Sequence, residues 1–298
     1  MLIPQKIRQI IGWPAISLAL VVAASLLMAG CSAVRLAYNQ APDLLYFQID
    51  GYLDFNDTQA LRVREDLSRL QQWHRTTQLP AYADLLHKTS QQLPDSITEA
   101  QACTTFNEVR AKLDAVLDYA QPTVLWVATQ LDEDQLKYLE RKQAKTNAEW
   151  KKEWLTGTPK EIQDRRFKQA LDRSEMIYGS LDEPQKAVIR AGVERSAFDA
   201  SMTLDERVRR QQDGLQMLRQ IAAQKLNAQQ AQPLMRAYMD RSLTSPNPAY
   251  QRYASTMVTE GCASFARVHN ATTPAQRAKA VQTLKGYEVD FRTLVAQR

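Results

Sequence analysis

Few side chains in this sequence have the type and spacing needed for catalysis or metal binding. The three histidines, His74, His87 and His269, do not stand at ligand spacing from one another or from a cysteine, so a zinc site is not expected. The chain has neither a Gly-x-Ser-x-Gly nucleophile turn nor a Walker phosphate loop, the usual signs of hydrolytic and nucleotide chemistry. The acidic run 132–134 is explained by a helix start, where carboxylates face the positive end of the helix dipole. We therefore predict a protein without enzymatic activity, cofactor or metal.

A second group of side chains indicates binding rather than reaction. The segment from Lys137 to Arg173 is rich in lysine and arginine and carries two tryptophans one helical turn apart. A basic, aromatic helix face of this kind can bind lipid phosphates or an acidic protein. The alternative is a solvated basic face with both tryptophans packed in the core. The residues of this candidate face are Lys145, Trp150, Lys151, Lys152 and Trp154.

The N-terminus has the pattern of an export signal. Lys6 and Arg8 precede an apolar run from Ile10 to Met28, and the run ends in Ala29-Gly30-Cys31. A basic start, an apolar centre and a small-residue exit predict a signal peptide over 1–30. The cysteine after the small residues predicts a lipobox, whose thiol would take diacylglycerol and whose new N-terminus would take a palmitate-like chain. The alternative is a transmembrane anchor, because the run is nearly long enough to span.

Lipidation at Cys31 would hold the mature chain to a membrane, since more than one acyl chain gives stable anchoring. Residues 31–40 then form the tether. Ser32 stands where an aspartate favours inner-membrane retention in enterobacterial lipoproteins, so this resemblance implies the periplasmic face of the outer membrane. The full chain has 38 Lys and Arg against 33 Asp and Glu, and the predicted leader holds only two of the basic residues. The mature body is therefore mildly basic, and a nucleic-acid partner is not expected.

Cys103 and Cys262 are the cysteines that remain after lipidation, and the predicted compartment oxidises thiols. We predict a disulfide between them; the alternative is two buried free thiols. Closing a loop of about 160 residues contributes on the order of 5 kcal/mol in the chain-entropy model. The bridge would bring early and late helices together, which favours a closed bundle over an extended array of repeats.

Composition and local patterns predict an all-α protein. The chain is 44% hydrophobic and 24% charged and contains only 9 glycines, which leaves little material for strands. A short polar residue followed three positions later by Gln or Glu is the capping-box signature of a helix start. Eight such boxes are Asn56/Gln59, Ser96/Glu99, Asp132/Gln135, Thr158/Glu161, Asp182/Gln185, Thr203/Glu206, Asn227/Gln230 and Thr273/Gln276.

The boxes and the apolar periodicity between them predict about nine antiparallel amphipathic helices in a closed bundle around a shared core. They form a single domain over 41–298, with a possible seam near 122, where Gln121-Pro122 would end a helix. The boxes at Asp132, Asp182, Asn227 and Thr273 recur at intervals of about one helical hairpin. This spacing is explained either by an internal repeat or by the frequency of capping boxes in helical proteins.

Several segments resemble the proteobacterial lipoprotein family DUF6279, whose function is unknown. These are Arg35-Leu36-Ala37-Tyr38-Asn39-Gln40, Asp50-Gly51-Tyr52-Leu53-Asp54-Phe55, Trp73-His74-Arg75 and Leu79-Pro80-Ala81-Tyr82. The runs Leu131-Asp132-Glu133-Asp134-Gln135 and Leu181-Asp182-Glu183-Pro184-Gln185 are also similar to the LTxxQ pattern of small periplasmic chaperones and envelope-stress sensors.

We expect a lipoprotein that binds or scaffolds an envelope protein or an acidic lipid. An LTxxQ-like chaperone or envelope-stress protein is one alternative. A cell-envelope enzyme with a cleft around His74 or Arg75 is the other.

Overall fold

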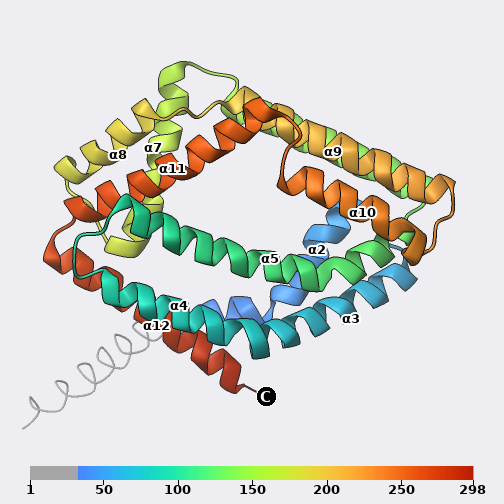
Figure 1. Cartoon of the computed structure of the whole chain (residues 1–298), viewed down its shortest axis with the longest axis horizontal. Helices are drawn as coiled ribbons and strands as arrows, with labels where there is room; N and C mark the ends of the chain where they lie inside the picture. Colours follow the sequence, from blue (N-terminus) through green and yellow to red (C-terminus); the bar gives the residue numbers. More distant parts are fainter. Residues whose placement is uncertain (1–32, 298) are drawn as a thin grey trace, which may run out of the picture.

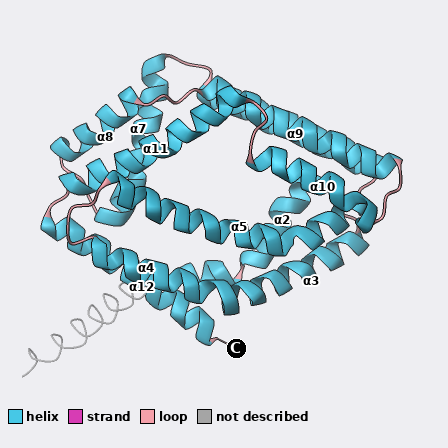
Figure 2. Ribbon diagram, in the orientation of Figure 1, coloured by secondary structure: helices cyan, strands magenta, loops and turns pink. Residues whose placement is uncertain are grey.

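A computed structural model describes residues 33–297, and within this range the chain is helical and has no strand (Figures 1 and 2). Residues 33–39 are helical and lead into the first bounded helix. The α-helices are α2 (Ala41–Leu53), α3 (Asp57–Trp73), α4 (Leu79–Gln92), α5 (Glu99–Gln130), α6 (Glu133–Trp154), α7 (Pro159–Tyr178), α8 (Glu183–Arg195), α9 (Ala200–Ala223), α10 (Ala228–Leu243), α11 (Pro248–Ala271) and α12 (Pro274–Ala296). A π-helical turn, η1 (His74–Gln78), joins α3 to α4.

The all-α prediction is confirmed, but the described range holds eleven bounded α-helices instead of about nine. Helix α2 has no capping box in the sequence, because it begins at Ala41-Pro42 without a side-chain cap, and it was therefore not predicted. The predicted signal peptide over 1–30 and the predicted lipidation site Cys31 lie outside the described residues. Between residues 33 and 297, no helix combines the length and apolar character needed to cross a membrane.

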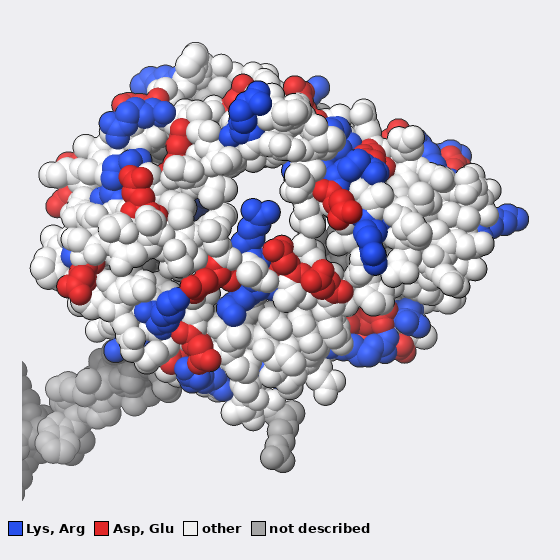
Figure 3. All heavy atoms as spheres, viewed as in Figure 1, with Lys and Arg blue, Asp and Glu red and all other residues white. Residues whose placement is uncertain are grey.

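The helices are arranged as a closed ring in which the chain doubles back several times, as where α10 returns along α9 (Figure 1). Helix α4 packs along α12, which brings the early and late parts of the chain together. Helix α5 contacts α11 near one end and α3, α9 and α10 near the other. The space-filling view in Figure 3 shows an opening through the middle of the ring, with acidic and basic side chains around it. The closed arrangement therefore surrounds a hole rather than a central core.

The apolar core is divided among separate clusters around this ring. One cluster joins α7, α8, α11 and α12 through Tyr178, Ile189, Val268 and Ala280. Three more clusters are formed by α5 with α9 and α10, by α5 with α11, and by α2 with α3 and α5. The single shared core expected from sequence is wrong, because helices arranged around an opening cannot all meet at one centre.

Six of the eight predicted capping boxes are present with both hydrogen bonds. They begin at Asn56, Asp132, Thr158, Asp182, Asn227 and Thr273. The predicted Ser96/Glu99 box is wrong, since α5 is capped two residues later by Thr98 and Gln101.

The Thr203/Glu206 box is also wrong, because α9 already begins at Ala200 with Asp199 as its cap. Glu206 lies inside α9, where it is buried and accepts hydrogen bonds from Arg209, Arg210 and Ser245. Burial raises the pKa of Glu206, but these hydrogen bonds outweigh burial and hold the pKa below its usual value.

Helix α5 continues through Pro122 to Gln130, so the predicted helix end at Gln121-Pro122 is wrong. An interior proline removes one backbone hydrogen bond and costs roughly 3 kcal/mol. The second half of α5 offsets that cost because Leu125 and Ala128 are buried against α9 and α10. The possible seam near 122 was inferred from a helix end that the structure does not have.

Candidate functional site

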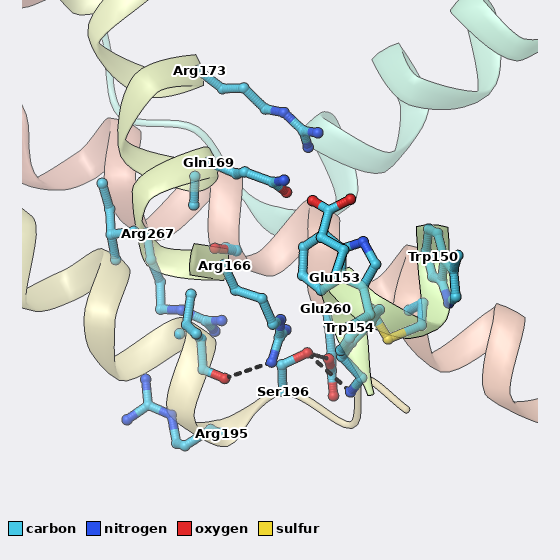
Figure 4. A pocket seen from close by; sticks show the side chains of 18 residues that line it. Trp150, Glu153, Trp154, Arg166, Gln169, Arg173, Arg195, Ser196, Glu260 and Arg267 are labelled. Carbon is cyan, nitrogen blue, oxygen red and sulfur yellow. Dashed lines mark hydrogen bonds between the residues drawn. The ribbon is translucent and has the colours of Figure 1, made fainter. Parts of the chain in front are cut away.

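A cavity of about 700 Å³ opens among α6, α7, α8 and α11. Figure 4 shows the side chains that line it. The C-terminal turns of α6 supply Trp150, Glu153 and Trp154, and α7 supplies Arg166, Gln169 and Arg173. The remaining polar or charged lining residues come from α8, the following loop and α11: Arg195, Ser196, Glu260, Ser264 and Arg267. This volume lies within the range of small-molecule sites.

Aromatic rings form one wall of the cavity. The ring centroids of Trp150 and Trp154 lie 5.6 Å apart, and Phe198 meets Trp154 edge-on at 5.8 Å. Trp154 is buried, whereas the indole nitrogen of Trp150 is buried without a hydrogen-bond partner in the described chain. A buried indole N–H without a partner is costly, and this one borders a cavity that could hold an acceptor.

Arginines dominate the charge of the cavity. Arg166 donates to the carbonyl of Val193 at 3.2 Å and stacks over Phe198, and burial lowers the pKa of Arg166 below its ordinary value. In Figure 4, Gln169 and Arg173 extend from α7 into the cavity. Arg173 and Arg195 form no ion pair with any residue in 33–297. Their guanidinium groups are therefore available to an anionic ligand.

One of the two acidic residues in the cavity already has structural partners. The Glu260 carboxylate accepts a hydrogen bond from the Ser196 hydroxyl at 2.8 Å. It also accepts from the backbone N–H of Ala197 at 3.0 Å, which fixes the loop between α8 and α9. Because these donors already use the Glu260 carboxylate, its charge opposes an incoming anion less than that of a free carboxylate would. The cavity favours anions over cations.

The structure divides the predicted basic and aromatic face. Trp150 and Trp154 line the cavity, while Lys145, Lys151 and Lys152 are exposed. Lys145 forms an ion pair with Glu149 at 4.0 Å on the surface. Side chains three or four positions apart on a helix share a face, as Trp150 and Trp154 do. Lys151 and Lys152 stand between them in the sequence and therefore point to other sides of the helix. The five residues do not form one surface.

The sequence analysis did not predict that the arginines of the cavity belong to one site. Arg166 and Arg173 are seven residues apart on α7, which is two helical turns, and this spacing was the available signal. Arg195 and Arg267 carry no such signal, since their approach depends on how α8 and α11 pack against α7.

The three histidines make structural contacts. His74 accepts or donates a hydrogen bond with the Tyr38 hydroxyl at 3.1 Å, and burial lowers the pKa of His74. Next to it, Arg75 donates to the Asn39 side chain at 2.8 Å. His87 is exposed and lies 3.2 Å from the Glu288 carboxylate. The segments that carry the family resemblance around Tyr38 and His74 thus join the tether to the η1 turn.

Cys103 and Cys262 lie at disulfide distance, with sulfur atoms 2.10 Å apart and Cα atoms 5.2 Å apart. The pair connects the first turns of α5 to the middle of α11, as the closed arrangement requires. In residues 33–297 no cluster of three His, Cys, Asp or Glu side chains has the geometry of a metal site.

Comparison with known proteins gives one match. A family model described as a family of unknown function (DUF6279) matches residues 51–237. No curated protein matches the chain, and no solved structure matches it.

Proposed function

The chain belongs to DUF6279, a family of unknown function, and we propose from its own geometry that it is a lipid-anchored, non-enzymatic protein of the bacterial cell envelope that binds an acidic envelope component. The observation that carries this proposal is the cavity in which Arg173 and Arg195, without an ion pair among residues 33–297, lie with an aromatic wall. Arginine guanidinium groups donate paired hydrogen bonds to carboxylates and phosphates. The ligand's anionic group would lie beside one of these two guanidinium groups.

The proposed anchor is supported by the surface next to it. Leu36, Leu44 and Phe47 are 63%, 59% and 64% exposed on the helical segment that begins two residues after Cys31. Their spacing places them on one side of that segment. An exposed apolar side directly after a lipidated cysteine would lie against the lipid surface. Ser32 supports the periplasmic face of the outer membrane as the location.

The binding proposal is tested by site-specific photocrosslinking in intact cells. A photoreactive phenylalanine analogue replaces Trp150 at the cavity wall, and in a matched control it replaces the exposed Lys151. We expect an adduct from position 150 that contains an acidic lipid or an acidic protein surface, identified by mass spectrometry. The double variant Arg173→Gln/Arg195→Gln should lose this adduct. The same adduct yield from both positions, or a yield that does not change in the arginine variant, would refute the proposal.

A further inference from the structure

A second cavity of about 480 Å³ lies between the end of α4, the start of α5 and α11. None of the residues that line it is charged. Its apolar lining residues are Leu93, Ile97, Ala102, Phe106, Met257, Val258, Cys262 and Phe265. Phe106 and Phe265 remain 45% and 38% exposed although they border this cavity. Exposed aromatic rings at an apolar cavity indicate a surface that an apolar ligand would cover.

The second cavity adjoins the arginine-lined cavity described above. Met257 and Gly261 line both cavities, and they lie one turn apart on the same side of α11. A Cβ atom built on Gly261 would have no heavy atom within 4 Å, so the space beside this residue is open. The two cavities therefore meet at this turn of α11, one lined by arginines and the other by apolar side chains.

From this juxtaposition we infer that the acidic ligand is an amphiphile, with its anionic head at Arg173 or Arg195, which lie at opposite ends of the cavity in Figure 4, and its alkyl chain in the apolar cavity. This inference rests on the proposed function, because it assigns the head to the same arginines. The shared chemistry is an alkyl chain that ends in an anion. Two sources fit it, a fatty acid with a carboxylate head and a phospholipid with a phosphate head.

The test measures binding of laurate and of dodecyl phosphate to the purified full-length protein by isothermal titration calorimetry. Dodecyl maltoside, which has the same chain and a neutral head, is the control ligand. We expect both anionic probes to bind more tightly than the maltoside, since only they pair with the arginines. The tighter of the two identifies the head as a carboxylate or a phosphate.

Two sets of variants separate the head site from the chain site. Gly261→Leu fills the open space where the cavities meet, and Gly51→Leu on α2 is a matched control, because a Cβ there also meets nothing within 4 Å. We expect Gly261→Leu to weaken dodecyl phosphate binding about tenfold, as displacing two methylenes from an apolar site would do. One of the two variants Arg173→Gln and Arg195→Gln should weaken it about tenfold or more through loss of a charged hydrogen bond, and that variant locates the head. Lys151→Gln is the exposed control for them.

The outcomes distinguish the inference from the proposed function. If either arginine variant weakens binding and Gly261→Leu does not, the alkyl chain does not occupy the apolar cavity, and the amphiphile inference is wrong while the proposed function stands. If Gly261→Leu weakens binding and the arginine variants do not, the head lies elsewhere and both are wrong. Absence of binding of both anionic probes by the wild-type protein overturns the amphiphile inference, while the proposed function, which also admits an acidic protein surface, is decided by the crosslinking experiment.

Discussion

At the scale of single residues, His269 has a fixed structural role. It is fully buried in α11, with Nδ1 2.9 Å from the Tyr178 hydroxyl and Nε2 2.8 Å from the carbonyl oxygen of Asp95. Because a carbonyl only accepts, Nε2 carries the proton and Nδ1 accepts from Tyr178. A neutral imidazole therefore links α7, α11 and the loop before α5, and a second proton would remove the acceptor that Tyr178 needs.

Acid should destabilise the fold through this histidine. Burial lowers the pKa of His269 from 6.5, and it also lowers the pKa of His74. Since the unfolded chain binds these protons more readily, the stability contributed by the neutral histidines is complete above the unfolded value and declines as pH falls through it. We expect the free energy of unfolding in urea to be lower at about pH 5.5 than at about pH 7.5.

The variant His269→Gln should have a weaker pH dependence than the wild type, and the double variant with His74→Gln should have the weakest. Loss of the two buried hydrogen bonds should also lower the stability of His269→Gln at neutral pH by about 2–4 kcal/mol. A wild-type pH slope in the double variant would contradict this role.

At the scale of helices, two pairs of N-termini are joined by glutamines. Gln59 and Gln135 exchange side-chain hydrogen bonds at 3.1 and 2.7 Å, and Gln185 and Gln276 do so at 2.7 and 2.9 Å. Each glutamine also donates to a carbonyl at the end of the helix that precedes its partner or one or two residues after that end. The glutamines of the two LTxxQ-like runs therefore join helix ends. The pairs link α3 to α6 and α8 to α12.

Replacing the amide of a paired glutamine by a carboxylate should be costly. Gln135→Glu removes the donors to Gln59, to the carbonyl of Leu53 and to that of Asp54, and it directs a negative charge at those oxygens. We expect a loss of about 2–4 kcal/mol in the free energy of unfolding. Gln230→Glu is the control, because Gln230 is exposed and glutamate suits a simple capping box. Equal stability losses in the two variants would show that pairing contributes nothing.

The sequence predicts these helix starts well and their pairing not at all. A capping box is formed within four residues, so its signature is visible locally, as at Asp132 and Asp182. The partners in a pair are 76 or 91 residues apart, and nothing local encodes that distance. The same limit applies to the arginines of the cavity, which come from different helices. The wrong prediction at Ser96/Glu99 has a local cause. The capping-box signatures Ser96/Glu99 and Thr98/Gln101 overlap, and Thr98 forms the cap.

At the scale of the whole molecule, the cysteine pair should determine how firmly the ring is closed. We expect Cys103 and Cys262 to take up no alkylating reagent in the denatured, unreduced protein and to be labelled fully after reduction. The double variant Cys103→Ser/Cys262→Ser should lose up to about 5 kcal/mol of stability in the chain-entropy model. Labelling of both thiols without reductant would show that the bridge does not form.

The proposed lipid anchor should determine where the whole protein is found. We expect the wild-type protein in the outer-membrane fraction and the variant Cys31→Ala outside it, because no other acylation site follows the small residues at 29 and 30. Cell fractionation followed by immunoblotting makes the comparison, and Cys103→Ala is the control for loss of a cysteine. Retention of Cys31→Ala in the membrane would mean that the apolar N-terminus itself is the anchor.

The cysteine pair also has a mechanical consequence. A protein held by one end to a membrane and by its body to another envelope component experiences tension, and tension applied through the termini cannot extend residues enclosed by a covalent bridge. The Cys103–Cys262 pair encloses a sequence separation of 159 residues, which includes helices α6, α7 and α8 of the arginine-lined cavity. Pulling on single molecules should therefore release a contour length that is shorter in the oxidised than in the reduced protein by on the order of 500 Å. Tension would then extend α2 to α4, α12 and the end of α11 after Cys262, whereas Arg173 and Arg195 lie within the enclosed loop.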